Sequence, residues 1–233
     1  MLLNILLTND DGWDAVGLQM LHKLAKPLGR LVVVAPRQQQ SGISHQLTLH
    51  RPVAWAQPSA DWYWIDGTPA DCVRIALTQL EIPFDWVLSG VNDGGNLGAD
   101  VYVSGTVAAA REACLHGLPS LALSQYRMRY REAFDCSLTE PMLQRVLDTY
   151  VVPVPTVPPH ENPPLLNVNF PDPASAREPA ELIECKLDPN PLPSAYELTD
   201  GGYLYSSRYR DRARAEGCDV ELCFGGAITV SRL

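Results

Sequence analysis

The feature that most constrains the fold is a series of short, mostly apolar runs, each followed directly by polar or glycine-rich sequence. Leu2–Leu7, Leu31–Ala35, Asp85–Leu88 and Leu121–Leu123 are such runs. A short run without polar alternation is typical of a strand that is buried on both faces of a sheet. Between the first two runs, apolar residues recur at helical spacing over Leu18–Leu28. This alternation predicts an α/β fold, a mostly parallel sheet with helices on both faces.

The composition changes after about residue 150. Twelve of the 20 prolines lie within Val151–Pro193, which excludes long helices there. Tyr203–Tyr209 and Ala227–Ser231 alternate with a period of two residues, as half-buried strands do. We therefore expect a catalytic core over residues 1–150, and a proline-rich, β-rich C-terminal segment over 151–233 that completes the core and forms contacts between subunits.

Charge and cysteine content exclude several classes of protein. A net charge of −9 argues against a nucleic-acid polymer as partner, because such binding depends on Lys and Arg neutralising phosphates. The six cysteines are scattered without a Cys-x-x-Cys pair, which is typical of a reducing compartment. The N-terminus lacks the basic region of a signal peptide, and no apolar run approaches the length of a membrane span. We expect a cytoplasmic protein without membrane contact.

Two adjacent carboxylates, Asp10 and Asp11, come directly after the first apolar run and precede Gly12. In open α/β sheets, ligands bind outside the carboxyl ends of the strands, so the pair lies where a site is expected. Like charges this close raise each other's pKa unless a cation lies between them, and a divalent metal is the simplest such cation. The alternative is that Asp10 caps the helix that follows, which requires only one of the two residues.

Polar residues also follow two other predicted strands. Ser41 lies just beyond the second run and Asn92 just beyond Asp85–Leu88. A hydroxyl and an amide oxygen complete the shell of a hard cation such as Mg²⁺ or Mn²⁺ without adding negative charge. Taken singly, both are also ordinary turn residues. The five histidines do not cluster at metal-ligand spacing, but His45 follows the Ser41 loop and is close enough in sequence to reach the site.

A glycine-rich segment, Gly90–Gly98, is followed by Ser104-Gly105-Thr106 at a predicted helix start. Backbone N–H groups and the positive end of a helix dipole make such a segment an anion-binding cradle. It lacks the Gly-Lys-Ser/Thr of a Walker loop. The alternative is a flexible crossover whose helix is capped by Ser104 or Thr106.

One further helix start is specified by its local sequence. Thr68 matches an N-cap, Pro69 the first helical position, and Asp71 the third residue of a capping box. These residues predict a helix that continues to Leu80.

Five stretches of the chain, in order, match one known family, and a weaker match over Gly217–Val230 continues toward the C-terminus. The stretches are Leu6–Gly12, Val34–Thr48, Gly67–Val73, Leu88–Ala110 and Asn167–Pro171. They resemble the SurE family, the survival protein E phosphatases. The resemblance implies a Rossmann-like core, a divalent-metal-dependent phosphatase activity on nucleoside monophosphates, and a C-terminal segment used in oligomerisation.

The resemblance also implies roles for particular residues. It carries the family's metal ligands onto four positions: Asp10, Asp11, Ser41 and Asn92. It places the bound phosphate near Asn96, Ser104 and Thr106, and we predict that Gly105, which lies between the last two, also binds the phosphate. We accordingly predict one Mg²⁺ or Mn²⁺ per subunit. We predict catalytic roles for four residues: Asp10, Asp11, Asn96 and Ser104.

The predicted reaction is hydrolysis of nucleoside 5′-monophosphates with broad specificity, by in-line attack of a water that the metal activates. A second hypothesis makes Asp10 or Asp11 a covalent nucleophile that forms an aspartyl phosphate. A third is a metal-gated nucleotide-binding or interaction protein without turnover. Because the strands expected over Tyr203–Leu233 would leave exposed edges, we predict a homodimer or homotetramer.

Overall fold

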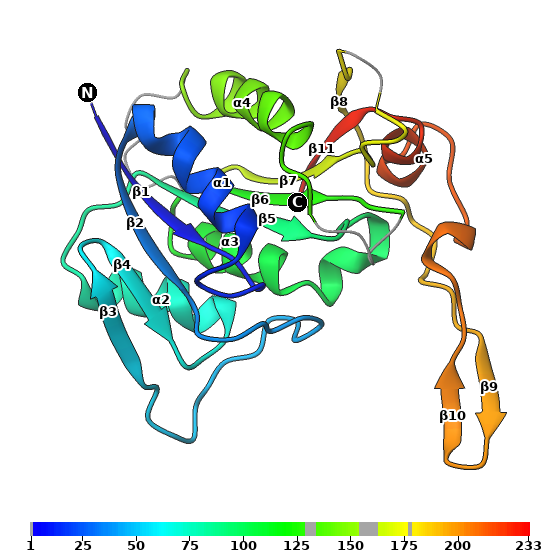
Figure 1. Ribbon diagram of the computed structural model, residues 1–233, viewed down its shortest axis with the longest axis horizontal. Helices are drawn as coiled ribbons and strands as arrows, with labels where there is room; N and C mark the ends of the chain where they lie inside the picture. The colour runs from blue at the N-terminus through cyan, green and yellow to red at the C-terminus, as the bar shows by residue number, and fades with distance from the viewer. Residues whose placement is uncertain (1, 129–133, 154–162, 177–178) are drawn as a thin grey trace.

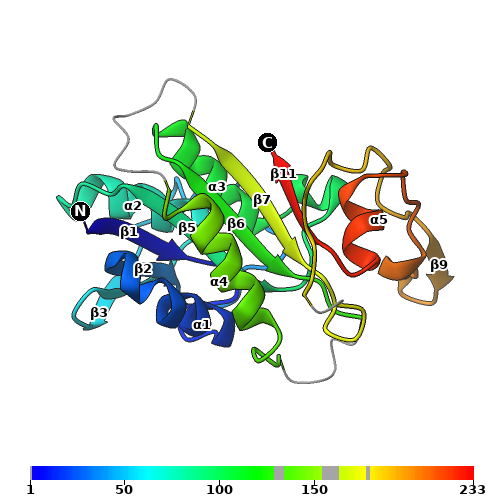
Figure 2. The same ribbon diagram turned by 90° about the horizontal axis from the view of Figure 1, so that it is seen from above.

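The computed structural model describes residues 2–128, 134–153, 163–176 and 179–233. It contains one large sheet between two layers of helices, and a small separate hairpin (Figures 1 and 2). In the described residues the large sheet has nine strands, in the order β3-β4-β2-β1-β5-β6-β7-β11-β8. These strands are β1 (Leu3–Thr8), β2 (Gly29–Pro36), β3 (Trp55–Ser59), β4 (Trp62–Ile65), β5 (Trp86–Asp93), β6 (Ser120–Gln125), β7 (Leu165–Phe170), β8 (Leu182–Glu184) and β11 (Ile228–Arg232).

The centre of the sheet is parallel, from β4 through β2, β1, β5 and β6 to β7. Antiparallel pairs occur where β3 joins β4 and where β11 joins β7. In the parallel part, Thr8 at the end of β1 lies beside Ser89 of β5. The carboxyl ends of these two central strands therefore open on the same edge of the sheet, as the sequence predicts.

The helices lie on both faces of the sheet, which confirms the predicted α/β class. Their bounds are α1 (Val16–Ala25), α2 (Pro69–Gln79), α3 (Gly105–Leu115), α4 (Thr139–Tyr150) and α5 (Asp219–Phe224), with 3-10 helices η1 (Lys26–Leu28), η2 (Gly98–Tyr102) and η3 (Tyr209–Asp211). Helices α1 and α4 bury apolar side chains against one face, in a cluster that includes Leu18, Leu143 and Phe170. Helices α2 and α3 cover the other face, with Val73 and Ala109 in their cluster. None of the helices within the described ranges is long and apolar enough to cross a membrane.

Two of the helix starts follow the sequence closely. Thr68 and Asp71 form the predicted capping box of α2, and Pro69 occupies its first turn. Ser104 caps α3 by accepting a hydrogen bond from the N–H of Val107 (3.1 Å). These features depend on residues three apart in sequence, so local chemistry is enough to predict them.

Other elements differ from the sequence expectation. The first residues of the glycine-rich segment belong to β5, which continues to Asp93. Helix α4 was not predicted, and it follows directly on Leu138. The tyrosine-rich strand is shorter than Tyr203–Tyr209: it is β10 (Gly202–Tyr205), and among the described residues it pairs with β9 (Tyr196–Thr199).

The C-terminal third contributes to two different structures. Strands β7, β8 and β11 extend the large sheet, and β11 is buried except at its end. Strands β9 and β10 form a hairpin that projects away from the sheet (Figure 1), and all of their residues are exposed. The C-terminal residues thus complete the core, whereas the hairpin remains outside it.

Candidate functional site

The acidic pair lies in a tight turn at the end of β1. The Asn9 side chain closes this turn, since its Nδ2 donates to the carbonyl of Gly12 (2.8 Å) and its Oδ1 accepts from the Gly12 N–H (3.2 Å). Gly12 has a φ of +113°, which favours glycine. As a result Asp10 points into the protein and is 4% exposed, whereas Asp11 is partly exposed.

Asp10 lies against the start of α3. The Thr106 hydroxyl donates to Asp10 Oδ1 (2.5 Å), and the Thr106 backbone N–H also binds this carboxylate. A Cβ at Gly105 would come within 2.9 Å of both Cβ and Oδ2 of Asp10, so the position requires glycine. Asp10 does not cap α1, whose N-cap is Ala15 without a side-chain hydrogen bond. The capping alternative for Asp10 is therefore wrong.

Burial raises the pKa of both carboxylates, and the charge of Asp11 adds to the shift of Asp10. Burial, and secondarily the charge of Asp11, raise the pKa of Asp10 from 3.8 to about 7, although the hydrogen bonds from Thr106 oppose this shift. Burial also raises the pKa of Asp11, against a hydrogen bond from the N–H of Asp93 (3.0 Å). Within the described chain, no lysine, arginine or histidine forms an ion pair with either residue. The pair is thus an excess of negative charge that an external cation would neutralise.

Asn92 reaches the same edge of the sheet from β5. Its Nδ2 donates to the carbonyl of Gly94 (2.7 Å). This hydrogen bond uses the amide nitrogen and not Oδ1, which is the atom that would coordinate a hard cation. The next residue, Asp93, donates its N–H to Asp11. Strand β5 therefore brings the predicted amide ligand and the acidic pair together.

The loop after β2 brings Ser41 toward the pair. The N–H of Gln40 donates to the carbonyl of Asp10 (2.7 Å), which fixes the backbone next to Ser41. Ser44 secures the far side of the loop, because its hydroxyl donates to the carbonyl of Tyr102 (2.7 Å). Ser41 itself is exposed, and its hydroxyl accepts from Gln39 Nε2 (2.8 Å).

His45 does not enter the site. Its Nε2 lies 2.7 Å from Glu112 Oε2, two turns down α3 from Thr106. Glu112 is buried and also contacts His116 (3.1 Å) and Arg74 (3.6 Å). The contact anchors the Ser41 loop to α3, so His45 acts on the position of the loop.

Asn96 and Ser104, which the sequence predicts beside the phosphate, are each held by their own hydrogen bonds, and we call residues 96–104 the floor of the predicted phosphate site. Asn96 donates from Nδ2 to Ser124 (2.8 Å) and from its backbone N–H to Asn169 (2.8 Å), and its carbonyl accepts from Asn167 (2.8 Å) and Asn169 (3.0 Å). Ser104 Oγ is engaged in the cap of α3. The sequence predicts that Ser104-Gly105-Thr106 belongs to an anion-binding segment. In the structure, Thr106 of this segment already binds the Asp10 carboxylate.

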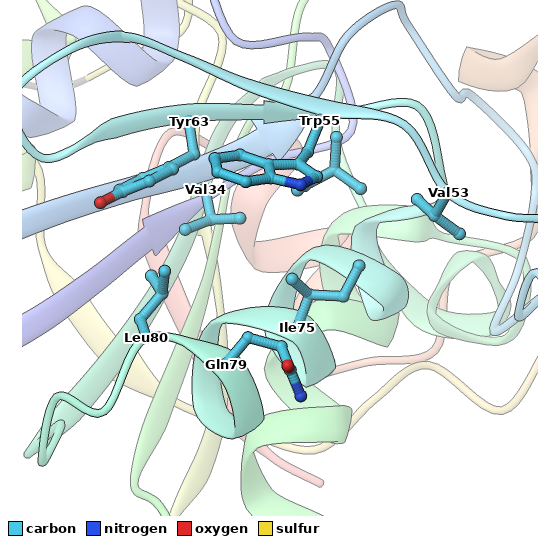
Figure 3. Close-up of a pocket in the computed structure, with 8 residues that line it drawn as sticks. Val34, Val53, Trp55, Tyr63, Ile75, Gln79 and Leu80 are labelled. Atoms are coloured by element: carbon cyan, nitrogen blue, oxygen red, sulfur yellow. The ribbon is translucent and has the colours of Figure 1, made fainter.

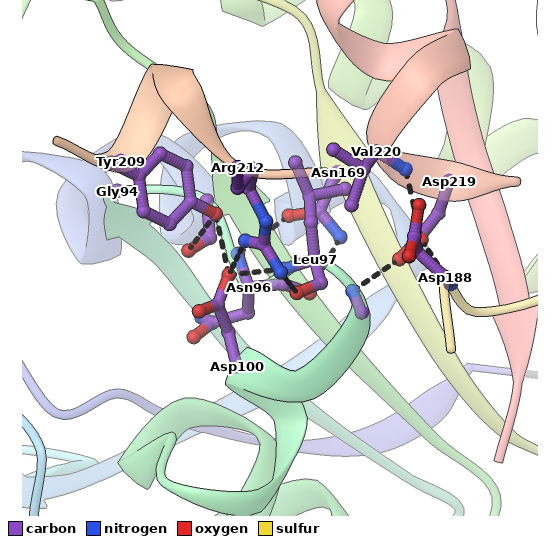
Figure 4. Close-up of polar contacts among 12 residues, drawn as sticks. Gly94, Asn96, Leu97, Asp100, Asn169, Asp188, Tyr209, Arg212, Asp219 and Val220 are labelled. Atoms are coloured by element: carbon purple, nitrogen blue, oxygen red, sulfur yellow. Dashed lines mark hydrogen bonds and ion pairs between the residues drawn. The ribbon is translucent and has the colours of Figure 1, made fainter. Parts of the chain in front are cut away.

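Residues from the C-terminal third support this floor, and sequence reasoning missed them (Figure 4). Arg212 donates to Asp100 Oδ2 (2.8 Å) and to the carbonyl of Leu97 (3.1 Å). The Tyr209 hydroxyl donates to the same oxygen of Asp100 (2.5 Å). Asp219 Oδ2 accepts from the N–H of Gly98 (2.8 Å). These contacts join positions more than 100 residues apart, and no local motif signals them.

The donor set fits a hard divalent cation. Asp10 and Asp11 supply carboxylate oxygens without a cationic partner in the described chain, and Asn92 and Ser41 supply neutral oxygens from neighbouring segments. A group of three or more His, Cys, Asp and Glu side chains suited to a metal does not occur among the described residues. The predicted ligand set contains two aspartates, a serine and an asparagine, so the absence of a group of three or more His, Cys, Asp and Glu side chains from the described residues does not test it.

The fold is a Rossmann-like α/β fold with two adjacent carboxylates just after the end of a central strand. The sequence model of the Survival protein SurE family matches residues 5–187, so the chain belongs to that family. A putative 5′-nucleotidase of Nostoc sp. is 41% identical over 231 residues, which cover 99% of each chain. The 5′-nucleotidase SurE of Rhodospirillum rubrum is 40% identical over 98% of this chain and 89% of its own.

A solved structure agrees with the family assignment. The SurE protein from Aquifex aeolicus superimposes with a TM-score of 0.82 at 30% sequence identity, over 99% of this chain and 92% of that one. The similarity therefore extends through the C-terminal third and is not limited to the acidic site.

Proposed function

We propose that this protein hydrolyses the phosphomonoester of nucleoside 5′-monophosphates, with one Mg²⁺ or Mn²⁺ per subunit. The observation that carries the proposal is the buried Asp10, held at the start of α3 beside Asp11 without a cationic partner in the described chain. The relatives named 5′-nucleotidase support the substrate class. When bound, a divalent ion supplies charge for the phosphoryl oxygens and a more acidic water.

The chain's own residues hold and orient the reactants. Thr106 fixes Asp10, and the Asp93 N–H fixes Asp11, so the two carboxylates are positioned before any ligand arrives. Asn92 and Ser41 complete the proposed ligand set from β5 and the loop after β2. Gly105 and the dipole of α3 favour negative charge at this point, which suits a phosphoryl group. We propose that Asn96 and Ser104 shape the phosphate-binding floor.

The test of the function is phosphate release from AMP, GMP, CMP and UMP by the intact chain, with and without EDTA. We expect turnover only with added Mg²⁺ or Mn²⁺. Full turnover in excess EDTA after dialysis would contradict the metal requirement. Absence of turnover on every phosphomonoester tested would favour a binding protein instead.

A covalent mechanism through Asp11 is the enzymatic alternative, since Asp11 is the more exposed carboxylate. It predicts a phosphoenzyme that acid quenching traps after mixing with substrate labelled in its phosphate. Under the proposed mechanism no label stays on the protein, because water attacks phosphorus directly.

We also propose a cytoplasmic homo-oligomer that uses the β9–β10 hairpin. Leu198 and Tyr203 are 75% and 78% exposed, and Tyr196 packs edge-on against Tyr205 (5.5 Å between ring centroids). A two-stranded hairpin on its own is marginally stable in water, so contact with a second copy would stabilise it. The sequence predicts a contact surface over Tyr203–Leu233, but β11 lies in the large sheet. We therefore propose that the β9–β10 hairpin alone forms the contact between copies. A monomeric mass by light scattering over a wide concentration range would overturn this proposal.

A further inference from the structure

A cavity of about 410 Å³ opens between the β3–β4 edge of the sheet and the C-terminal half of α2 (Figure 3). Trp55 and Tyr63 form its wall on the strands, and Ile75, Gln79 and Leu80 form its wall on the helix. None of the residues proposed for the phosphatase site lines it. The cavity is therefore a separate feature that the proposed reaction does not use.

The cavity has the form of a slot with one aromatic wall. The rings of Trp55 and Tyr63 lie side by side, with centroids 6.3 Å apart and planes 39° apart. Trp55 is 62% exposed although it lies in a strand of the main sheet. The facing side chains of Ile75 and Leu80 are aliphatic (Figure 3). A flat ring inserted here would stack on aromatic surface and cover apolar surface on both sides.

The lining also sets the charge of the ligand. Among the described residues that line the slot there is no lysine, arginine, histidine, aspartate or glutamate. An anion would lose hydration here without gaining a partner, so the slot suits a neutral molecule. This is the opposite of the Asp10 site, where charge dominates.

Two polar groups give the slot a basis for orientation. The Tyr63 hydroxyl and the Gln79 amide belong to opposite walls (Figure 3). Gln79 Nε2 donates to Thr78 Oγ1 (3.1 Å), which engages the nitrogen and not Oε1. A glutamine amide matches the amino edge of adenine. A mostly apolar pocket with a few polar groups is typical of small-molecule sites.

We propose that this slot binds a neutral heteroaromatic ring of purine size, stacked on Trp55, with the ring's amino group donating to Gln79. Nucleosides have this chemistry, and the proposed reaction releases them. Only the choice of a nucleoside as the natural ligand rests on the proposed function. Binding of the ring rests on the slot alone.

The experiment is calorimetric titration of the intact chain with adenosine and with adenine. Trp55→Ala should weaken both by about tenfold or more, as expected for loss of stacking on a base, whereas Trp55→Phe should retain most of the affinity. Gln79→Ala should weaken adenosine but not purine riboside, which lacks the amino group. The control is Gln57→Ala, an exposed residue of the same strand outside the lining, which should bind normally.

Three results would overturn the proposal. The first is absence of saturable binding by the unsubstituted chain at millimolar ligand. The second is equal binding by Trp55→Ala, which would place the ligand elsewhere, including at the phosphatase site. The third is an oligomer that dissociates in Trp55→Ala while the unsubstituted chain binds neither adenosine nor adenine, which would make the slot an interface between copies. Trp55-dependent binding in a chain that hydrolyses no nucleotide would support the slot and refute only the proposed function.

Discussion

Two buried aspartates border the glycine-rich segment, and they differ in the charge that surrounds them. Asp10 and Asp100 are 4% and 7% exposed. Asp100 accepts from Arg212, from the Tyr209 hydroxyl and from the N–H of Leu97 (3.0 Å). It is therefore neutralised within the protein.

Asp10 has the opposite surroundings. Its nearest charge is the negative one of Asp11, and its hydrogen bonds come from the uncharged Thr106. Burial alone does not distinguish the two aspartates, but the balance of charge does. A buried carboxylate paired with a cation holds segments together, whereas one that faces a second carboxylate fits the cation from solution that we propose for this site.

The largest effect should come from removing charge at the unpaired site. Asp11→Asn should lower AMP turnover on the order of 100-fold or more, because one of the two proposed carboxylate ligands loses its charge. The metal-free protein should melt no lower than the unsubstituted chain, since the repulsion on Asp10 is relieved. Phosphate release and thermal melting measure the two effects. The exposed Asp14, substituted as Asp14→Asn, is the matched control and should keep full turnover.

At the paired site, the larger change should be in stability. Arg212→Met leaves the Asp100 carboxylate without its cation and should lower the free energy of unfolding by about 3–5 kcal/mol in urea titrations. Adding Asp100→Asn should restore part of this loss. Arg210→Met serves as control, because Arg210 forms an exposed ion pair in which its Nε lies 3.7 Å from Asp211 Oδ1. Losing a pair of this kind should cost little stability. If Arg212→Met lowers the free energy of unfolding no more than this control does, the ion pair between Arg212 and Asp100 does not stabilise the segment that contains Asp100.

A smaller effect should come from Thr106, which orients Asp10 without adding charge. Thr106→Val keeps the shape of the side chain and removes the hydrogen bond, and turnover should fall about 10- to 100-fold, as for other residues that orient metal ligands. Thr78→Val is the control on α2, where the hydroxyl donates to the carbonyl of Arg74 (2.7 Å). Unchanged kcat/KM in Thr106→Val would show that Asp10 needs no such support.

The smallest effect should come from the part of the substrate farthest from the carboxylates. If the site binds phosphate through a metal and α3, as we propose, it contacts what all nucleotides share, so kcat/KM should vary by about tenfold or less among AMP, GMP, CMP and UMP. A preference of several orders of magnitude for one base would show that base recognition, and not charge at Asp10, dominates the site.

Sequence reasoning succeeded where the chemistry is local. The Thr68–Asp71 capping box and the Ser104 cap depend on residues three apart, and the strand ends of β1 and β5 follow from the order of apolar runs. Helix α4 was missed although Met142, Leu143, Val146 and Leu147 are buried at helical spacing. That signal was present and lay just before the proline-rich segment.

The support of the glycine-rich segment could not be predicted in this way. Tyr209 and Arg212 reach Asp100 and Leu97 across more than 100 residues, and Asp219 reaches Gly98 across 121. Nothing in the neighbourhood of these residues in the sequence indicates the pairing, because it depends on how the C-terminal third returns to the sheet. His45 is close enough in sequence to reach the predicted site, but the fold places it against Glu112 instead.

The position of β11 has a consequence for how the chain folds during synthesis. This strand comes last in chain order among the described strands, yet it lies between β7 and β8 in the sheet. Until the ribosome releases Ile228–Arg232, β7 has an unpaired edge, and β8 has no neighbour in the sheet. An open edge of this kind pairs readily with other chains. We therefore expect nascent chains that stop before Ile228 to aggregate, even though every proposed site residue has already been made.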